Sequence, residues 1–216
     1  MGKQVGLQLQ EIFGFIAGGI GVYTAVPQAL HIRKLGHGTG VSLGYWITML
    51  VVNASWFGYA LLVSSPSIIF ANGIGFITSG LVVAALLKRE LIVWPIMLVA
   101  GALWCWGFMQ LPWPVITVML VALTFSRLPQ LIRSVRSYRA GIETAVSLRS
   151  LYIGLLTMLL WEAYSFASGL MQLIITTTIG LTLTLTVLAL EILGKRKAAR
   201  LQAIEDVDGR NPQTSW

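Results

Sequence analysis

Two tryptophans and one asparagine stand inside long apolar stretches, where aromatic and amide groups have a restricted set of roles. Trp56 and Trp161 each lie deeper in such a stretch than a tryptophan at a membrane surface usually does. An indole ring stacks on the apolar face of a ring-shaped solute and donates a hydrogen bond through its N–H group. Asn72 offers two donors and an acceptor. The alternatives are an interfacial aromatic belt for the tryptophans and helix–helix hydrogen bonding for Asn72, and the latter role is favoured for Asn53.

A Pro-Gln pair occurs twice, as Pro27-Gln28 and Pro129-Gln130, each time near one end of an apolar stretch. Proline lacks an N–H group and interrupts the hydrogen bonding of a helix. Because the prolines recur at matching positions of two apolar stretches, a hinge in each helix is favoured. The alternative is that neighbouring helices satisfy the freed backbone groups, so that the prolines are tolerated without acting as hinges. Gln28 and Gln130 are candidates for a gate beside these hinges.

Two charged residues stand out in the apolar stretches, where a charge at the centre of a helix costs roughly 2.5–3.5 kcal/mol on insertion scales. Glu162 follows Trp161 directly and is a candidate for carrying a coupling proton or for closing a gate. Arg127 lies near the end of its stretch, so its side chain can reach the membrane surface; the alternatives are contact with an anionic solute or a gate lock.

Composition places all these residues in a membrane protein. Of the 216 residues 56% are hydrophobic and 11% are charged, against roughly 25% charged in soluble domains. The net charge of +7 comes from short loops and the tail, which is a topology signal and not a nucleic-acid surface. We expect that the protein is not an enzyme and that it holds no cofactor or metal ion, because its sequence shows no nucleophile–base pair and no cluster of metal ligands.

Seven stretches are long enough to cross a bilayer, which takes about 17–25 residues. Short links such as 64–66 and 110–112 force neighbouring helices to be antiparallel. Gly14, Gly18 and Gly21 are predicted to let the first helix pack closely on another. The predicted spans are 12–32, 43–63, 66–87, 91–109, 112–134, 148–169 and 171–193, with a tail at 194–216 that is flexible after its first turns.

The basic residues fix the predicted orientation. Thirteen of the 15 lysines and arginines fall in the loops and the tail on one side of the seven spans, and Lys3 and Arg127 are the exceptions. Positive residues favour the cytoplasm. We therefore expect the N-terminus (1–11) outside, the tail in the cytoplasm, and a plasma membrane, taken as bacterial, as the location.

An internal repeat is visible in the sequence. With a constant offset, Val41-Ser42-Leu43 aligns with Val146-Ser147-Leu148, Trp56 with Trp161, Tyr59 with Tyr164, and Gly75 with Gly180, and six of 24 positions in 41–64 are identical. Each predicted copy, 12–87 and 112–193, holds three helices, and three crossings invert a chain. The helix at 91–109 restores the direction, so the copies are predicted to be parallel and joined as 3+1+3.

The doubled Pro-Gln, the Trp-x-x-Tyr pairs and the Ala71-Asn72-x-x-Gly75 stretch resemble the PQ-loop/MtN3 clan, and within it the SWEET and SemiSWEET sugar transporters. The resemblance covers about 12–193. It implies a fold of seven transmembrane helices in two parallel three-helix bundles with a linker helix. It also implies a central pocket lined by Trp56, Asn72, Trp161 and Thr177, where Thr177 replaces a second asparagine, and helix-bending prolines at Pro27 and Pro129.

We therefore expect facilitative, uniport transport of a mono- or disaccharide by alternating access, with the solute bound between the repeats. One alternative is a proton-coupled carrier of amino acids or other solutes that uses Glu162. Another is a membrane receptor or scaffold that binds without flux. The expected partners are a small polar solute and the lipid bilayer, with no nucleic acid; homo-oligomerisation stays open.

Overall fold

The computed structural model describes residues 2–22, 29–30, 32–34, 41–142, 144 and 146–207. Within these residues the chain is all-α, without strands. Six of the helical segments are long and apolar enough to cross a membrane, which supports an integral membrane protein. The helices are α1 (Gly2–Val22), α3 (Leu43–Val63), α4 (Pro66–Leu87), α5 (Glu90–Met109), α6 (Trp113–Thr124), α7 (Leu128–Ala140), α8 (Leu148–Ser168) and α9 (Met171–Val207), with a 3₁₀ turn, η1 (Phe125–Arg127), between α6 and α7.

Six of the seven predicted spans correspond to these segments, and the first, predicted at 12–32, is only partly described. The prediction placed a helix at 12–32 after a polar N-terminus, but α1 already begins at Gly2 and residues 23–28 lie outside the described part. The first ten residues include Lys, Gln and Leu, which are good helix formers even where they are polar. Polarity marks the edge of a membrane span, and it does not end the helix.

The last helix also extends beyond its predicted end. α9 continues to Val207, past the first turns of the tail, after which flexibility was expected. Lysine, arginine, alanine and leucine are strong helix formers, so the helix has no local reason to stop at the membrane surface. Packing on α7 adds support, because Lys197 Nζ donates to the carbonyl of Tyr138 at 3.1 Å and lies 5.4 Å from the centre of its ring.

A tight turn divides the span predicted at 112–134. Pro129 has no N–H group to offer the carbonyl of Phe125, and the chain forms η1 there. The N–H group of Leu128 donates to that carbonyl instead, which closes a 3₁₀ turn. The helix then resumes as α7 and runs to Ala140, so α6, η1 and α7 form one long interrupted rod.

The helices α3 and α8 are built alike. Both are 21 residues long, and Ser42 and Ser147 cap their N-termini by accepting an N–H group three residues later. Their C-caps, Ser64 and Gly169, both adopt left-handed backbone conformations with φ of 52° and 68°. Each pair of caps is related by the constant offset found in the sequence.

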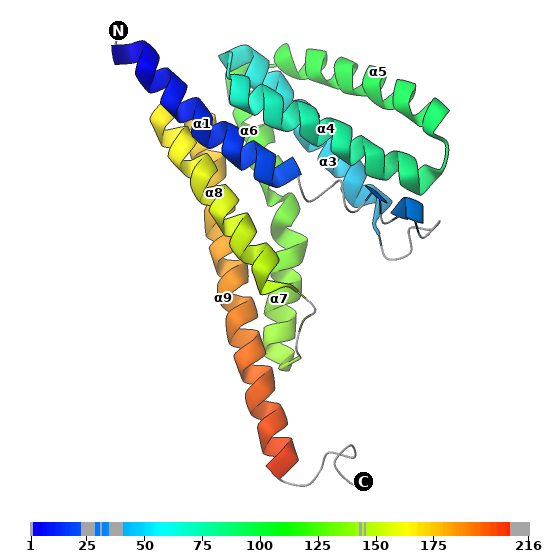
Figure 1. Cartoon of the computed structure of the whole chain (residues 1–216), viewed down its shortest axis with the longest axis vertical. Helices are drawn as coiled ribbons and strands as arrows, with labels where there is room; N and C mark the ends of the chain where they lie inside the picture. Colours follow the sequence, from blue (N-terminus) through cyan, green and yellow to red (C-terminus); the bar gives the residue numbers. More distant parts are fainter. Residues whose placement is uncertain are drawn as a thin grey trace.

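The remaining helices group around α4 and α9. α4 packs against α1 and α3, and α9 packs against α7 and α8 (Figure 1). Contacts between the two groups are made by α1 with α8 and by α3 with α6. α5 lies on α3 and α4, where Trp104 Nε1 donates to Ser55 Oγ at 2.8 Å; Trp104 therefore holds α5 in place and is not purely a lipid-facing residue.

Glycines set the closest approaches between helices. A Cβ on Gly18 would lie 2.7 Å from the Cβ of Ala71, and one on Gly14 would lie 2.2 Å from Ser67 Oγ, so both admit α4 against α1. The predicted packing role is confirmed for these two glycines. Gly75 faces Asn53, whose amide also lies 3.4 Å from Ser79 Oγ and so links α3 to α4 as predicted.

The pair α8–α9 repeats the packing register of α3–α4. A Cβ on Gly180 would meet Met158 Sδ at 3.3 Å, and a Cβ on Gly75 would meet Asn53 Oδ1 at 2.3 Å. Gly180 corresponds to Gly75, and Met158 to Asn53, at the same sequence offset. The two helix pairs therefore bring equivalent residues into contact although most of their side chains differ.

Buried residues are distributed unevenly along the bundle. One cluster draws on both groups of helices and lies beside the links 64–65, 110–112 and 169–170; we call this the tyrosine end. It contains Tyr59, Ala60, Ile68, Phe108, Ile116, Leu120, Tyr164 and Leu173. At the opposite end, which we call the basic end after the cations of 88–89 and 195–197, separate clusters lie within each group, one around Ile32 and Val82 and one around Leu151 and Leu188. The helix groups meet at the top of Figure 1 and diverge below.

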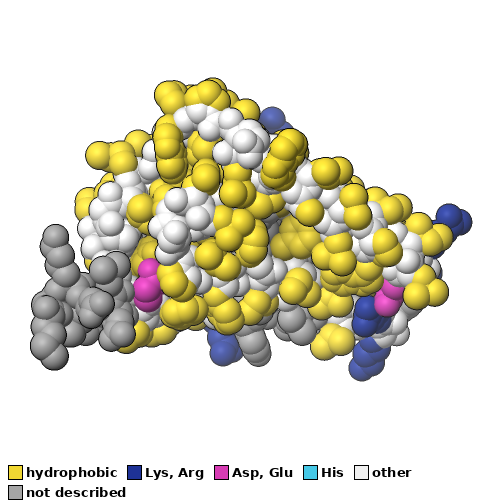
Figure 2. All heavy atoms as spheres, turned by 90° about the horizontal axis from the view of Figure 1, so that it is seen from above, with side chains coloured by type: hydrophobic (Ala, Val, Ile, Leu, Met, Phe, Trp, Pro, Cys, Tyr) yellow, Lys and Arg dark blue, Asp and Glu magenta, His cyan; other side chains and the backbone are white. Residues whose placement is uncertain are grey.

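The outer surface is strongly apolar. Leu91, Val118 and Trp106 are 94%, 68% and 66% exposed. Figure 2 shows hydrophobic side chains over most of the face in view, with the Lys and Arg side chains towards its edges. Such a surface requires a lipid environment.

Candidate functional site

Two matching aromatic pairs stand at the tyrosine end. Trp56 and Tyr59 on α3 meet edge to face, with ring centres 5.5 Å apart and planes at 85°. Trp161 and Tyr164 on α8 repeat this arrangement at 5.7 Å and 85°. In each pair the two residues are three apart, which places them on one side of a helix. Both tyrosines are almost completely buried, and both tryptophans pack against the same central cluster.

Each tyrosine hydroxyl reaches across to the other group of helices. Tyr164 Oη lies 2.7 Å from Ser65 Oγ at the start of α4. Tyr59 Oη donates to Gln172 Oε1 at the start of α9, over a longer 3.4 Å. Trp113 adds a second edge-to-face contact to Tyr59, with centres 6.2 Å apart. The two contacts cross, so that each group of helices is fastened by a tyrosine to the first turn of a helix in the other.

Glu11 reinforces one of these crossings. Its carboxylate accepts the hydroxyl of Tyr164 at 3.0 Å and the backbone N–H of Ser67 at 2.8 Å. A carboxylate near a helix N-terminus is favoured by the helix dipole. Glu11 therefore joins α1, α4 and α8. The sequence prediction missed it, because 1–11 was assigned to the extracellular N-terminus; a lone carboxylate directly before an apolar run was the available signal.

The four residues predicted to bind a solute are partly brought together. Trp56 and Trp161 share one cluster, as described above. Asn72 is half-buried, and its amide donates to the carbonyl of Ile68 one turn earlier at 2.9 Å. Thr177 is buried between α8 and α9, where its hydroxyl donates to the carbonyl of Leu173 and lies 3.2 Å from Ser165 Oγ.

Neither of the two described cavities is lined by any of these four residues. The tryptophans thus occupy a common place between the helix groups, whereas the hydroxyl of Thr177 is committed within its own group.

Glu162 faces α9 with one carboxylate oxygen satisfied. Its Oε1 accepts the hydroxyl of Thr178 at 2.6 Å. Its Oε2 is buried and has no hydrogen-bond partner among the described residues. An unsatisfied charged oxygen in an apolar environment is costly. The arrangement leaves one oxygen of Glu162 open to a partner that the described residues do not supply.

Arg127 and the second Pro-Gln pair lie at the interruption between α6 and α7. Arg127 Nη1 lies 3.5 Å from Thr184 Oγ1 of α9, which is a long contact. Pro129 occupies the first turn of α7, and Gln130 follows it with an exposed side chain. The local break in the helix at Pro129 is present. Pro27 and Gln28 lie outside the described residues.

A second carboxylate missed by the sequence prediction lies at the basic end. Glu191 on α9 is only 3% exposed and accepts hydrogen bonds from Ser134 Oγ on α7, at 2.6 Å, and from the hydroxyl of Thr144. Lys195 Nζ donates to the carbonyl of Thr144 at 3.2 Å. Glu191 thus holds α7 and the link between α7 and α8 against α9. It lay at the end of a predicted apolar helix beside basic residues, where it resembled a surface charge.

Comparison with known proteins adds no family to this description. No protein-family model matches the chain, no curated protein matches it significantly, and neither does any solved structure. The arrangement of helices, the paired aromatic residues and the isolated carboxylates are therefore the basis for a functional assignment.

Proposed function

We propose that this chain is a seven-helix membrane protein of 3+1+3 layout, with its N-terminus outside and its C-terminus in the cytoplasm. The matched caps of α3 and α8, the matched glycine registers and the crossed contacts between the helix groups all support two parallel repeats. An axis along the membrane normal relates such repeats in several transporters, including the SWEETs. The first proposed span keeps its predicted bounds, 12–32, of which α1 supplies the part up to Val22, and α5 is the linker helix.

The proposed activity is facilitative transport of a small sugar by alternating access. One observation carries the proposal: the repeats are joined by crossed tyrosines at one end, while at the other end each forms a separate core. Such an arrangement would suit a carrier that is closed to the outside and open to the cytoplasm. Rocking of one repeat against the other would break the tyrosine contacts and close the basic end.

The sugar would bind between the repeats, about one helical turn deeper in the membrane than the crossed tyrosines. Trp56 and Trp161 supply two aromatic faces from opposite repeats for the apolar face of a sugar ring. Asn72 supplies polar groups for the sugar hydroxyls. Thr177 contributes less than the resemblance implied, because its hydroxyl already bonds within α8 and α9. Pro129, with η1, is the proposed bending point of the second repeat.

Distances between spin labels test this proposal. Replacing the only cysteine, Cys105, by serine gives a background in which label pairs are introduced at Ser64 and Ser168 and, separately, at Arg89 and Arg139. Double electron–electron resonance in nanodiscs is recorded without solute and with D-glucose, sucrose or an amino acid. We expect a sugar to shorten the Arg89–Arg139 distance and lengthen the Ser64–Ser168 distance. Changes of both pairs in the same direction, or no change with any solute, would contradict alternating access.

A second candidate function rests on Glu162. Its unpartnered Oε2 favours a carrier in which this carboxyl takes up and releases a proton together with an amino acid or another solute. Uptake would then depend on pH and respond to an imposed proton gradient, and Glu162→Gln would abolish both effects while leaving exchange at equilibrium. A sugar flux that is independent of the proton gradient in wild-type protein excludes this candidate.

A further inference from the structure

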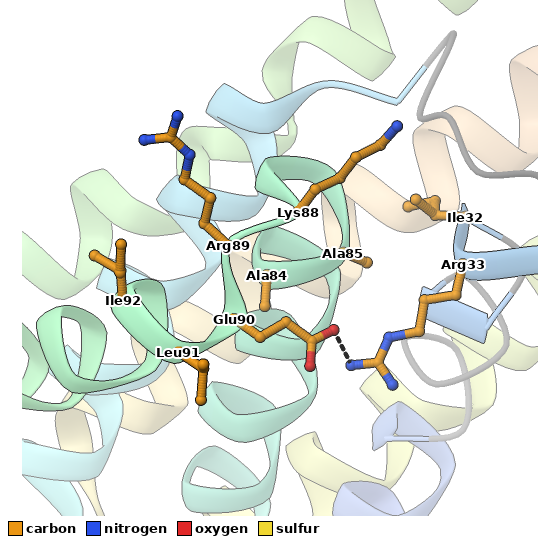
Figure 3. Close-up of a pocket in the computed structure, with 9 residues that line it drawn as sticks. All are labelled: Ile32, Arg33, Ala84, Ala85, Lys88, Arg89, Glu90, Leu91 and Ile92. Atoms are coloured by element: carbon orange, nitrogen blue, oxygen red, sulfur yellow. Dashed lines mark hydrogen bonds and ion pairs between the residues drawn. The ribbon is translucent and has the colours of Figure 1, made fainter.

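A groove opens at the basic end of the molecule, where α4 ends and α5 begins. Its volume is about 780 Å³, and its walls include Arg33, Lys88, Arg89, Glu90, Leu91 and Ile92 (Figure 3). It lies apart from the tyrosine end and shares no residue with the solute site proposed above. The groove combines charged and apolar walls, so it requires an explanation of its own.

The charges of the groove are only partly neutralised from within. Arg33 Nη2 lies 2.7 Å from Glu90 Oε1, which pairs one cation with the one acidic wall residue named above. The backbones of Lys88 and Arg89 take part in the helix hydrogen bonding of α4 and α5, but their side chains make no hydrogen bond or ion pair with any described residue. Two exposed cations on adjacent positions thus remain available to an anion.

The backbone fixes these two cations at the turn. Lys88 ends α4 in a left-handed conformation with φ of 54°, which is uncommon for a residue with a side chain. Arg89 follows as the N-cap of α5 and gives no side-chain hydrogen bond to the first turn of that helix. The first turn of α5 therefore lacks a side-chain cap, and its acidic residue, Glu90, is paired with Arg33, so the positive end of the helix dipole adds to the attraction for an anion.

The other side of the groove is suited to hydrocarbon. Leu91 is 94% exposed and Ile92 is 58% exposed, and both continue into the apolar surface of α5. In Figure 3, Lys88 and Arg89 extend to one side of the turn while the Leu91 side chain points to the opposite side. Ile92 extends to the same side as Arg89 in this view, so exposed cations and exposed aliphatic residues border one groove and match the two parts of a phospholipid.

We propose that this groove binds an anionic phospholipid. The lipid phosphate and its charged headgroup lie against Lys88 and Arg89, and an acyl chain runs along Leu91 and Ile92. A free phosphate ion uses only the cations and leaves the aliphatic wall in contact with water. A zwitterionic lipid uses the same aliphatic wall, but its headgroup carries a positive group that is repelled by Lys88 and Arg89. Basic pockets between helices at a membrane surface bind acidic lipids for these reasons.

Native mass spectrometry in detergent tests the assignment. Purified wild-type protein is mixed with equal amounts of phosphatidylglycerol and phosphatidylcholine of identical acyl chains. We expect wild-type protein to retain a single phosphatidylglycerol at least about fivefold more often than phosphatidylcholine. The double variant Lys88→Gln/Arg89→Gln is expected to lose this preference. Both residues are exposed, and a circular dichroism spectrum checks that the helices are intact.

The matched control removes two other cations from the same end. Arg136 and Arg139 on α7 are exposed and line neither described cavity, so Arg136→Gln/Arg139→Gln must keep the preference. Equal loss in both double variants would mean that net charge alone attracts the lipid, and would overturn the site. Retained preference in the Lys88/Arg89 variant would overturn it as well. Competition by inorganic phosphate alone, at the concentration of the lipid, would identify a simple anion site instead.

The aliphatic wall is tested separately. Leu91→Ser is expected to weaken retention of phosphatidylglycerol severalfold, because it removes the exposed surface on which the acyl chain lies. Soluble glycerophosphate, which has a phosphate but no acyl chain, is expected to bind both proteins equally and weakly. Unchanged lipid retention in Leu91→Ser would show that the aliphatic wall takes no part.

Discussion

The hydroxyl of Tyr164 lies 2.7 Å from the hydroxyl of Ser65, although 99 residues separate them in the chain. Tyr164 belongs to α8 in the second proposed repeat, and Ser65 is the N-cap of α4 in the first. Tyr164 belongs to the buried cluster at the tyrosine end, to which both helix groups contribute, and Ser65 is buried beside it. Its partner contact, from Tyr59 to Gln172, is longer and makes no use of a carboxylate. The two crossings are therefore unequal, and the one at Tyr164 is expected to be the stronger.

Loss of the Tyr164 hydroxyl should loosen the tyrosine end. Tyr164→Phe keeps the ring contact with Trp161 but leaves Ser65 and Glu11 without this partner. We expect the free energy of unfolding to fall by about 1–2 kcal/mol, at the upper end of values for hydrogen bonds between membrane helices. Reversible unfolding in bicelles measures it. The control is Tyr152→Phe, at a tyrosine that is 52% exposed and whose replacement should be nearly neutral. Equal stability of the two variants would argue against the crossing.

Glycines at neighbouring positions of α1 should respond differently to the same added methyl group. A Cβ on Gly18 falls 2.7 Å from that of Ala71, whereas one on Gly19 meets nothing within 4 Å. Gly18→Ala is expected to destabilise the fold by about 1–3 kcal/mol through overpacking. Gly19→Ala is expected to be neutral or to stabilise by up to about 1 kcal/mol through helix propensity. Thermal unfolding of both variants compares them, and the same shift in each would mean that α1 does not pack on α4 through Gly18.

Glu191 should control access to the link between α7 and α8. Glu191→Ala removes the acceptor of Ser134 and Thr144, and hydrogen bonds to a charged group are worth about 1.5–3 kcal/mol. Trypsin cleavage after Arg139 or Arg149 should become at least severalfold faster. Glu191→Gln keeps the size of the side chain and one acceptor oxygen. Its cleavage rate should lie between those of wild-type protein and Glu191→Ala. An unchanged cleavage rate in Glu191→Ala would show that the link is held by other contacts.

Much of the fold followed from the sequence, because membrane spans are long and apolar and the aromatic residues recur at a fixed offset. The spacing of Trp56 and Tyr59 predicts that both side chains share one helix face, and the same holds for Trp161 and Tyr164. The helix α1 begins before its predicted span and α9 ends after its predicted span, because hydropathy reports where lipid ends and not where a helix ends. Seven spans remain a prediction, since residues 23–28 lie outside the described part.

The polar partners were harder to predict than the helices. Glu11 and Glu191 acquire their roles only through helices distant in sequence, at separations of 153 residues to Tyr164 and 57 to Ser134. A single sequence gives no indication of such partners. Thr177 shows the opposite kind of difference. The repeat aligns it with Asn72, which suggested a solute contact, but its hydroxyl contacts Ser165 and donates to the carbonyl of Leu173 in its own helix.

Counterflow of a radiolabelled sugar in proteoliposomes tests the central claim most directly. Vesicles loaded with unlabelled sugar should accumulate labelled sugar transiently through wild-type protein. Trp161→Ala and Trp56→Ala should each lower the initial rate at least tenfold while the protein stays folded, whereas Trp106→Ala, at a tryptophan 66% exposed on α5, should retain it. Absence of counterflow with every mono- and disaccharide would contradict the sugar carrier, and equal rates in all three variants would contradict the tryptophan site.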